Sequence, residues 1–158
     1  MRLGVLDVGS NTVHLLIVET HSGARPNPIA SVKTELRLID YVNHDGAISD
    51  TGVKKLTDVI RKSIEKAYEK EVQEILPFAT SALRDATNGS QVIKEINEIF
   101  KIDLQVMSGE EEARTTFFAA RRWFGWSSGR LLVCDIGGGS LEIAVGVDET
   151  PDFAISLP

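Results

Sequence analysis

Cysteine, long apolar runs and positive charge are all scarce in this sequence. Its single cysteine, Cys134, excludes an intrachain disulfide, and the apolar run 131–134 around it predicts a buried thiol on a strand. No apolar run approaches the length that spans a membrane, and Asp7 follows too few apolar residues for a signal peptide. We therefore predict a protein of the reducing cytoplasm that does not enter membranes.

Acidic residues outnumber basic ones, with 23 Asp and Glu against 17 Lys and Arg and a formal net charge of −6. This balance argues against a surface for duplex nucleic acid, where basic residues usually dominate. It does not exclude a phosphorylated ligand, because backbone N–H groups, helix N-termini and a bound metal can hold phosphates locally. With 42% hydrophobic and 25% charged residues, the composition is that of a soluble globular protein.

The order of the expected elements points to an α/β fold, in which helices and strands alternate after an opening meander of three strands. Apolar runs between turn formers predict strands, and apolar residues at helical spacing predict helices, with N-caps at Ser49 and Ser108. A loop at 22–28 connects the second and third strands. The expected strands are 3–8, 13–18, 29–38, 74–79, 102–107, 131–136, 141–147 and 153–157, and the expected helices are 49–67, 92–100 and 108–124.

The last part of the sequence repeats the first. Asp7 and Asp135, 128 positions apart (135 − 7 = 128), each end a strand and are followed by an apolar residue, a glycine and a small polar loop that opens another strand. We therefore predict a duplicated unit, with a first domain at 1–126 and the start of a second at 127–158. The second copy lacks covering helices, and its open apolar face indicates that the chain is a fragment or continues further.

The two glycine-rich loops, 7–12 and 135–140, are the strongest candidates for a binding site. Glycine lets the backbone approach a ligand closely and tolerates positive φ angles, so the loop N–H groups can point at phosphate oxygens. Asp7 and Asp135 stand at the mouths of these turns, where a carboxylate can hold Mg²⁺. The alternative is that both loops are ordinary hairpin turns. Glu142 either faces the ligand or is a solvent-exposed strand carboxylate.

Two further segments carry charged candidates. Arg84 follows a strand at the start of a helical turn, where it can clamp phosphate with its planar fork or simply pair with Asp85 on the surface. The three acids 110–112 open the last helix, where negative charge suits the helix dipole. They are either a solvated helix start or the source of a carboxylate that deprotonates water.

Four motifs in order give the chain a family resemblance. Together they resemble the exopolyphosphatase/guanosine pentaphosphate phosphohydrolase family, which belongs to the superfamily of actin-like proteins, sugar kinases and heat-shock chaperone ATPases. The serine-asparagine of the first loop and the segment from Ser108 are specific to the phosphatase branch. The motifs are Asp7-Val8-Gly9-Ser10-Asn11-Thr12, Thr80-Ser81-Ala82-Leu83-Arg84-Asp85-Ala86, Ser108-Gly109-Glu110-Glu111-Glu112-Ala113-Arg114 and Asp135-Ile136-Gly137-Gly138-Gly139-Ser140-Leu141-Glu142.

The resemblance implies a fold and a role for each candidate residue. The fold is a ribonuclease H-like (actin-like ATPase) domain with a mixed sheet flanked by helices, plus the first strands of a second similar domain. Glu112 matches the general base that activates water, Asp135 and Glu142 the acids that hold Mg²⁺ or the water, Asp7 the first-loop acid, and Arg84 a phosphate-binding arginine. The implied phosphate contacts are Gly9, Ser10, Asn11, Thr12, Gly137, Gly138, Gly139 and Ser140.

The implied reaction is release of the terminal phosphate of inorganic polyphosphate with Mg²⁺, and the nearest alternative is hydrolysis of guanosine pentaphosphate. Two alternatives of other classes are an ATP-binding module that drives assembly or chaperoning, and a small-molecule kinase. A homodimer is an option that the sequence leaves open. Because family members carry a complete second domain, we expect this chain alone to turn over slowly or not at all.

Overall fold

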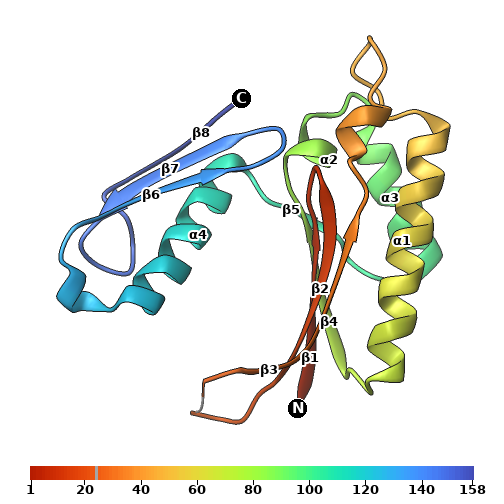
Figure 1. Cartoon of the computed structure of the whole chain (residues 1–158). Helices are drawn as coiled ribbons and strands as arrows, with labels where there is room; N and C mark the ends of the chain where they lie inside the picture. The colour runs from red at the N-terminus through yellow and green to blue at the C-terminus, as the bar shows by residue number, and fades with distance from the viewer. Residues whose placement is uncertain (24) are drawn as a thin grey trace. The chain divides into compact units, whose positions relative to one another are not determined.

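The computed structural model describes residues 1–23 and 25–158, so residue 24 of the predicted loop 22–28 lies outside the described residues. The chain divides into two units, Met1–Val106 and Met107–Pro158 (Figure 1). These units divide at a different position from the predicted domain boundary between 126 and 127, because the helix α4 (Gly109–Phe124) packs on the strands that follow it. The predicted boundary stays a prediction, and the sequence signal at 125–129 marks the end of this helix.

The first unit is built on a mixed five-stranded sheet of order β3-β2-β1-β4-β5. The first three strands pair antiparallel as the predicted meander, and β4 and β5 add parallel to β1. The elements are β1 (Arg2–Val8), β2 (Thr12–Glu19), β3 (Asn27–Glu35), η1 (Leu38–Tyr41), α1 (Asp50–Glu69), β4 (Glu74–Ala79), α2 (Ser81–Asp85), α3 (Gly89–Phe100) and β5 (Gln105–Val106).

One face of this sheet carries the core. Alternate residues of β1 and β2 are buried there, and α1 and α3 cover that side of the sheet (Figure 1). Ser49 caps α1 as predicted, because its side chain accepts a hydrogen bond from the N–H of Gly52 at 3.3 Å. No helix of the described residues combines the length and apolarity needed to cross a membrane.

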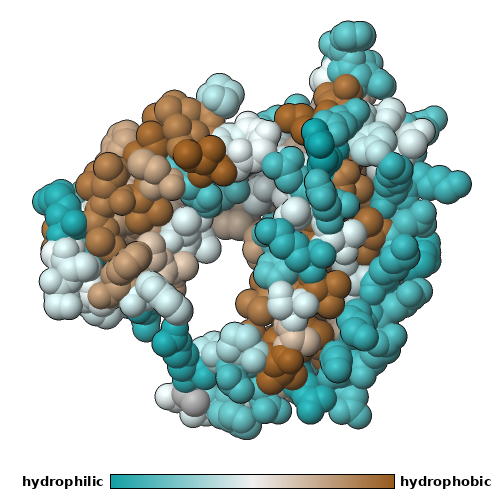
Figure 2. Space-filling model, in the orientation of Figure 1, coloured by the Kyte–Doolittle hydropathy of each residue, from teal (hydrophilic) through white to brown (hydrophobic). Residues whose placement is uncertain are grey.

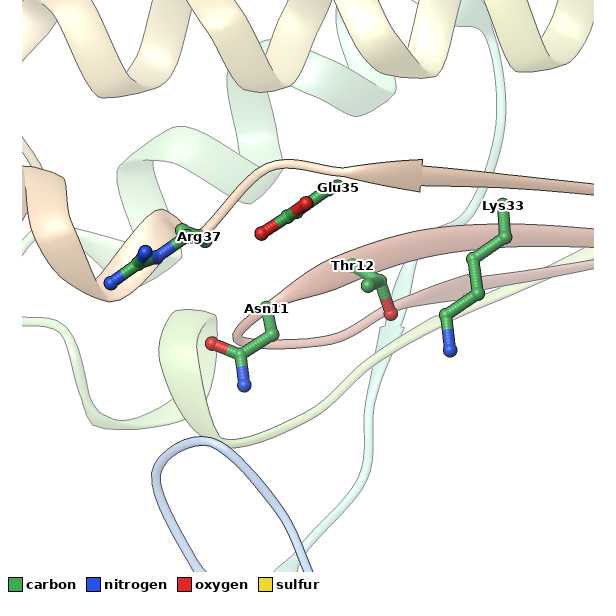
Figure 3. Close-up of a pocket in the computed structure, with 5 residues that line it drawn as sticks. All are labelled: Asn11, Thr12, Lys33, Glu35 and Arg37. Atoms are coloured by element: carbon green, nitrogen blue, oxygen red, sulfur yellow. The ribbon is translucent and has the colours of Figure 1, made fainter.

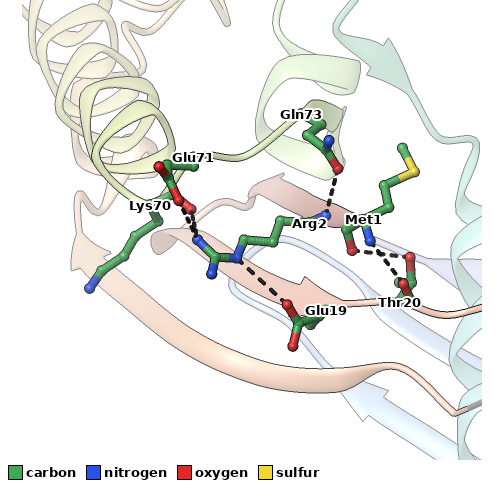
Figure 4. Close-up of polar contacts among 7 residues, drawn as sticks. All are labelled: Met1, Arg2, Glu19, Thr20, Lys70, Glu71 and Gln73. Carbon is green, nitrogen blue, oxygen red and sulfur yellow. Dashed lines mark hydrogen bonds and ion pairs between the residues drawn. The ribbon is translucent and has the colours of Figure 1, made fainter.

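Polar contacts of Arg2 tie the end of α1 to the first strand (Figure 4). Its guanidinium lies 3.0 Å from the carboxylate of Glu71 and donates to the carbonyl of Lys70 at 2.9 Å. Its backbone N–H donates to the Gln73 side chain at 3.0 Å. These contacts fix where the chain leaves the helix and enters β4, which runs parallel to β1.

The second unit is an antiparallel sheet of order β6-β7-β8 with α4 on one face. Ala113 and Phe117 of α4 pack against Ala144 of the middle strand. The unit also contains the short helix η2. Its remaining elements are η2 (Trp126–Ser128), β6 (Leu131–Ile136), β7 (Leu141–Gly146) and β8 (Phe153–Leu157).

The other face of the second sheet is apolar and exposed. Hydrophobic side chains gather over these strands in the space-filling view (Figure 2). Leu132 is 66% exposed and Ile136 is 83% exposed. Cys134 lies between them on the same face and is exposed, so the prediction of a buried thiol is wrong. In the first unit, α1 covers the equivalent face, which carries Leu6 and Leu15.

Strand register confirms the predicted duplication. Asp7 pairs with His14, and Asp135 pairs with Glu142, so both members of the pair shift by the same 128 positions (135 − 7 and 142 − 14). The whole β6–β7 register repeats that of β1–β2 with this offset. Glu142 therefore occupies in the second unit the place that His14 occupies in the first.

Arg121 is fully buried between α4 and the second sheet. Its guanidinium donates to the carbonyls of Gly125, Gly129 and Gly146 at 3.2, 2.8 and 3.1 Å, and to the hydroxyl of Ser128 at 3.0 Å. These acceptors belong to the end of α4, the turn after it and the end of β7. One buried side chain thus links three segments of the second unit by hydrogen bonds.

We expect Arg121→Met to lower the free energy of unfolding by about 3 kcal/mol, because it leaves buried carbonyls without donors and removes packed volume. The matched control is Arg122→Met on the next residue of α4, whose exposed guanidinium pairs with Glu149 at 2.7 Å. That exposed pair contributes at most about 1 kcal/mol. Urea unfolding of both variants tests the difference, and equal losses would contradict it.

Candidate functional site

The two glycine-rich loops form the same turn. The N–H of Gly9 donates to the carbonyl of Thr12 at 3.0 Å, and the N–H of Gly137 donates to the carbonyl of Ser140 at 2.9 Å. A Cβ added to either glycine would lie 3.2 Å from the same carbonyl oxygen. Both loops are therefore hairpin turns with one geometry. Their predicted binding of a ligand stays a prediction.

Positive φ angles are not the reason for glycine in these turns. Within the described residues, the glycines with positive φ are Gly23, Gly46, Gly125 and Gly129, and they lie in neither loop. The tolerance of glycine for positive φ is therefore not used in either loop. Glycine gives these turns close approach to their own carbonyl and to any ligand above them, because it has no Cβ.

Backbone hydrogen bonds from the segment 36–38 to two carbonyl groups hold the first loop in place. The carbonyl of Asn11 accepts from the N–H groups of Leu36 and Arg37, both at 2.9 Å, and that of Ser10 accepts from Leu38 at 2.8 Å. In residues 1–23 and 25–158, no intramolecular hydrogen bond uses the N–H of Ser10 or Asn11. These two donors remain available to an anion, as the predicted phosphate contact requires.

Arg37 makes this support possible by adopting a left-handed conformation, with φ 50° and ψ 56°. Non-glycine residues adopt it at a cost, and here it turns the backbone so that three successive N–H groups meet the loop. The Arg37 side chain pairs with Asp40 at 2.9 Å. No motif or spacing in the sequence singled out Arg37.

An open hollow of about 510 Å³ adjoins the first loop. The side chains of Asn11, Thr12 and Lys33 point to the same side of the strands there (Figure 3). The ammonium group of Lys33 forms no ion pair or hydrogen bond with the described residues. The hollow thus places the positive charge of Lys33 beside the predicted phosphate contacts Asn11 and Thr12. Its lining residues are Asn11, Thr12, Lys33, Glu35 and Arg37.

A buried hydrogen bond joins the first loop to the segment after β4. The hydroxyls of Ser10 and Ser81 lie 2.6 Å apart, and both residues are buried. Because β1 and β4 are parallel neighbours, with Val8 opposite Ala79, the residues that follow them meet at one edge of the sheet. That topology was the signal that could have identified Ser81 from the sequence.

Arg84 lies on α2, where its guanidinium pairs with Asp85 at 3.1 Å. Its side chain is 20% exposed, so it is neither buried nor fully solvated. The pair is the surface interpretation that spacing alone favoured. The phosphate-binding role implied by the resemblance stays a prediction.

The three acids in the first turn of α4, Glu110, Glu111 and Glu112, have different surroundings. Glu110 pairs with Arg114 at 2.8 Å. Glu111 completes a capping box with Ser108, whose hydroxyl and backbone N–H lower the pKa of the Glu111 carboxyl. This contribution to the helix is present above the ordinary pKa and is lost as pH falls through the lowered one. Glu112, which is half-buried, is the acid with no part in the cap.

Asp135 and Glu142 face each other across β6 and β7 on the side covered by α4. Glu142 is only 2% exposed, and the hydroxyl of Ser156 donates to its Oε1 at 2.7 Å. The hydroxyl of Thr116 on α4 lies 3.4 Å from Asp135. Like charges opposite each other on a sheet repel, and a buried carboxylate requires compensation.

The described residues supply no cation for this pair, since neither Asp135 nor Glu142 forms an ion pair with them. They also contain no group of three or more His, Cys, Asp or Glu that would hold a metal by itself. Two facing carboxylates are suitable oxygen ligands for Mg²⁺, with its remaining positions left to water and substrate. The chemistry of Asp135 and Glu142 thus fits the ion that the resemblance implies.

The predicted site residues fall into two groups. The second unit brings together Glu112, Asp135, Glu142 and the loop 137–140. The first unit holds Asp7, the loop 9–12 and Arg84. Glu112 therefore belongs with the second set of candidates, although the sequence placed it in the first domain. Thr116, Ser81 and Ser156 are polar neighbours of these candidates that the sequence analysis did not single out as site residues.

Comparison with known proteins gives consistent relatives. Residues 16–158 match the Ppx/GppA phosphatase family. The chain is 50% identical over 158 residues to exopolyphosphatase 1 of Mycobacterium tuberculosis, covering 100% of this chain and 46% of that protein. It is 33% identical over 141 residues to guanosine-5'-triphosphate,3'-diphosphate pyrophosphatase of Vibrio vulnificus, covering 89% of this chain and 28% of that protein.

A solved structure supports the fold. An exopolyphosphatase from Cytophaga hutchinsonii superposes with a TM-score of 0.91 at 29% identity, covering 99% of this chain and 50% of that one. The predicted mixed sheet flanked by helices is thus confirmed. The chain spans about half the length of the curated relatives it matches at 50% identity.

We expect Arg37→Val to weaken binding of inorganic triphosphate and to lower stability by about 1–2 kcal/mol, because a β-branched residue resists the left-handed conformation. Arg37→Gly is the matched control, since it also loses the Asp40 ion pair but adopts this conformation freely. Isothermal titration calorimetry and urea unfolding measure the two effects. If both variants behaved alike, the backbone conformation would not be what supports the loop.

Proposed function

Because the chain belongs to the Ppx/GppA phosphatase family, we propose that it serves the hydrolysis of the terminal phosphoanhydride bond of inorganic polyphosphate. The exopolyphosphatase relative supports this substrate, with 50% identity over the whole chain against 33% over 141 residues for the guanosine-5'-triphosphate,3'-diphosphate pyrophosphatase. A phosphoanhydride hydrolase needs donors for phosphate oxygens, compensation for negative charge and a base for water. Each of the two units contributes to this list.

The observation that carries the proposal is the uncompensated carboxylate pair Asp135 and Glu142 beside the second glycine turn. Glu142 is nearly fully buried, and no described Lys or Arg pairs with either acid. A divalent cation with its phosphate ligand resolves both the burial and the repulsion. We therefore assign Asp135 and Glu142 as the residues that hold Mg²⁺, with Asp7 as the equivalent acid of the first turn. When bound, Mg²⁺ would neutralise charge on the phosphates.

The two glycine turns, 9–12 and 137–140, would bind the phosphates. The N–H groups of Ser10 and Asn11 have no partner within the described chain and would donate to phosphate oxygens. Residues 137–140 form the same turn and would do so from the second unit. Arg84 would add its guanidinium fork if a phosphate competes with Asp85. Such fixed donors stabilise the charge that spreads over the transferred phosphoryl group.

Glu112 is the proposed base. Water attacks the terminal phosphorus, the bond to the bridging oxygen breaks, and the shortened polyphosphate leaves with that oxygen. The proton of the water passes to the Glu112 carboxylate. The family resemblance singles out Glu112 among the three acids, whereas Glu111 completes the capping box. Glu112 also lies one helical turn before Thr116, which contacts Asp135.

Guanosine pentaphosphate is the second candidate substrate, supported by the relative from Vibrio vulnificus. The same turns and acids would act on it, because its terminal phosphoanhydride bond presents the same chemistry. The predicted cytoplasmic location and the homodimer stay predictions. Neither the assembly module nor the small-molecule kinase gains an observation in its favour.

We expect Glu112→Gln in the full-length protein to lower phosphate release from long-chain polyphosphate by about 10²–10⁴-fold, the usual cost of losing a general base. Polyphosphate binding should stay within about twofold, because the amide keeps the size of the side chain. Release of phosphate with and without Mg²⁺, and binding by fluorescence polarisation, measure the two quantities.

Glu110→Gln is the matched control on the preceding residue, and its activity should stay close to that of the unmodified protein. Activity of Glu112→Gln near that of the control would remove Glu112 from the mechanism. Faster release from guanosine pentaphosphate than from polyphosphate would replace the proposed substrate with the second candidate.

A further inference from the structure

We propose that Ser156 is a positioning residue for Glu142, and that Gly109 sets the position of Ser156. The proposal rests on the role assigned above to Glu142 as a ligand of the divalent cation. It adds two residues of α4 and β8 to the site, neither of which contacts the reacting atoms itself. Its physical basis is one hydrogen bond and one close packing contact, both within the second unit.

The hydrogen bond is the polar restraint on a nearly buried carboxylate. The Oγ of Ser156 donates to Oε1 of Glu142 at 2.7 Å, as expected for a hydroxyl bound to a charged acceptor. No other hydrogen bond or ion pair reaches the Glu142 carboxylate from the described residues. Cross-strand register explains the contact, since Glu142 on β7 lies directly opposite Ser156 on β8. The bond holds Oε1 and leaves the second oxygen for another ligand.

Gly109 determines where this hydroxyl lies. A Cβ at Gly109 would come within 2.3 Å of the Cβ of Ser156 and 2.5 Å of its Oγ, which no real side chain allows. Gly109 is not among the glycines with positive φ, so its role is clearance and not backbone freedom. The first turn of α4 can therefore rest directly against β8 at Ser156.

This contact links two parts of the proposed mechanism. Gly109 opens the helix that carries Glu112, and Ser156 holds the strand carboxylate that faces Asp135. A shift of α4 against β8 would displace the Ser156 hydroxyl and release Glu142 from its fixed orientation. The close approach at Gly109 thus keeps the proposed base and the proposed metal ligands in one rigid arrangement.

The test uses the full-length protein and Mn²⁺ as a spectroscopic probe of the cation site. We expect Ser156→Ala to weaken Mn²⁺ binding by roughly tenfold or more, as a lost hydrogen bond to a charged group typically does. Electron paramagnetic resonance of free Mn²⁺ measures this without reference to catalysis. The kcat for polyphosphate should fall by a similar factor while KM changes by less than about twofold.

Gly109→Ala is the second variant, and it should weaken Mn²⁺ binding in the same direction although the Ser156 hydroxyl remains. Ser127→Ala is the control, because it removes an exposed hydroxyl outside the site and should leave Mn²⁺ affinity unchanged. In the double variant with Glu142→Gln, Ser156→Ala should add no further loss, because its effect passes through Glu142. The melting temperatures of all variants confirm that they are folded.

Unchanged Mn²⁺ affinity in both Ser156→Ala and Gly109→Ala would overturn the proposal, as would losses that add fully to that of Glu142→Gln. The failure of the proposed function looks different. If the unmodified protein binds Mn²⁺ through Glu142 but releases no phosphate from polyphosphate, the substrate assignment falls and the role of Ser156 stands. If the unmodified protein binds no Mn²⁺ through Glu142, the positioning role falls with it.

Discussion

One backbone hydrogen bond closes each glycine turn, and the arrangement of the candidate residues depends on it. It runs from the glycine N–H to the carbonyl three residues later, and it sets the register of the two strands that leave the turn. A shift by one residue would move every side chain of a strand to the other face of the sheet. The register places Asp7 opposite His14 and Asp135 opposite Glu142, on the face that does not carry Leu6.

The two units contain equivalent β-hairpins, and their helices cover opposite faces of these hairpins. In the first unit α1 covers the face of Leu6, so Asp7 lies on the other face. In the second unit α4 covers the face of Asp135 and Glu142 and leaves the face of Cys134 exposed. Duplication of one hairpin therefore does not produce two identical sites, because α4 buries Glu142 whereas the equivalent His14 is only half-buried. Because α4 covers Glu142, its carboxylate is removed from water, and this burial is costly without a cation.

Patterns that depend on neighbours in the sequence predicted the local structure well. The caps at Ser49 and Ser108, the meander and the repeat of the glycine turns are all present, because capping and register are local properties. The helical pattern of α4 does not reveal which strands the helix packs on, so the sequence could not show that it belongs to the second compact unit. The buried Arg121 and the left-handed Arg37 were missed, because nothing in the local sequence reveals the acceptors that they meet.

The sequence by itself determined the duplicated turns, the acids at their mouths and the order of motifs that indicates the family. These features are carried by residue types at fixed spacing, which a linear chain displays directly. Only the tertiary structure decided which acids become partners. Packing of α4 on β7 and β8 buries Glu142 and brings Gly109 against Ser156. Such contacts join residues far apart in the chain, and their consequences depend on burial and clearance, which exist only once the elements have packed.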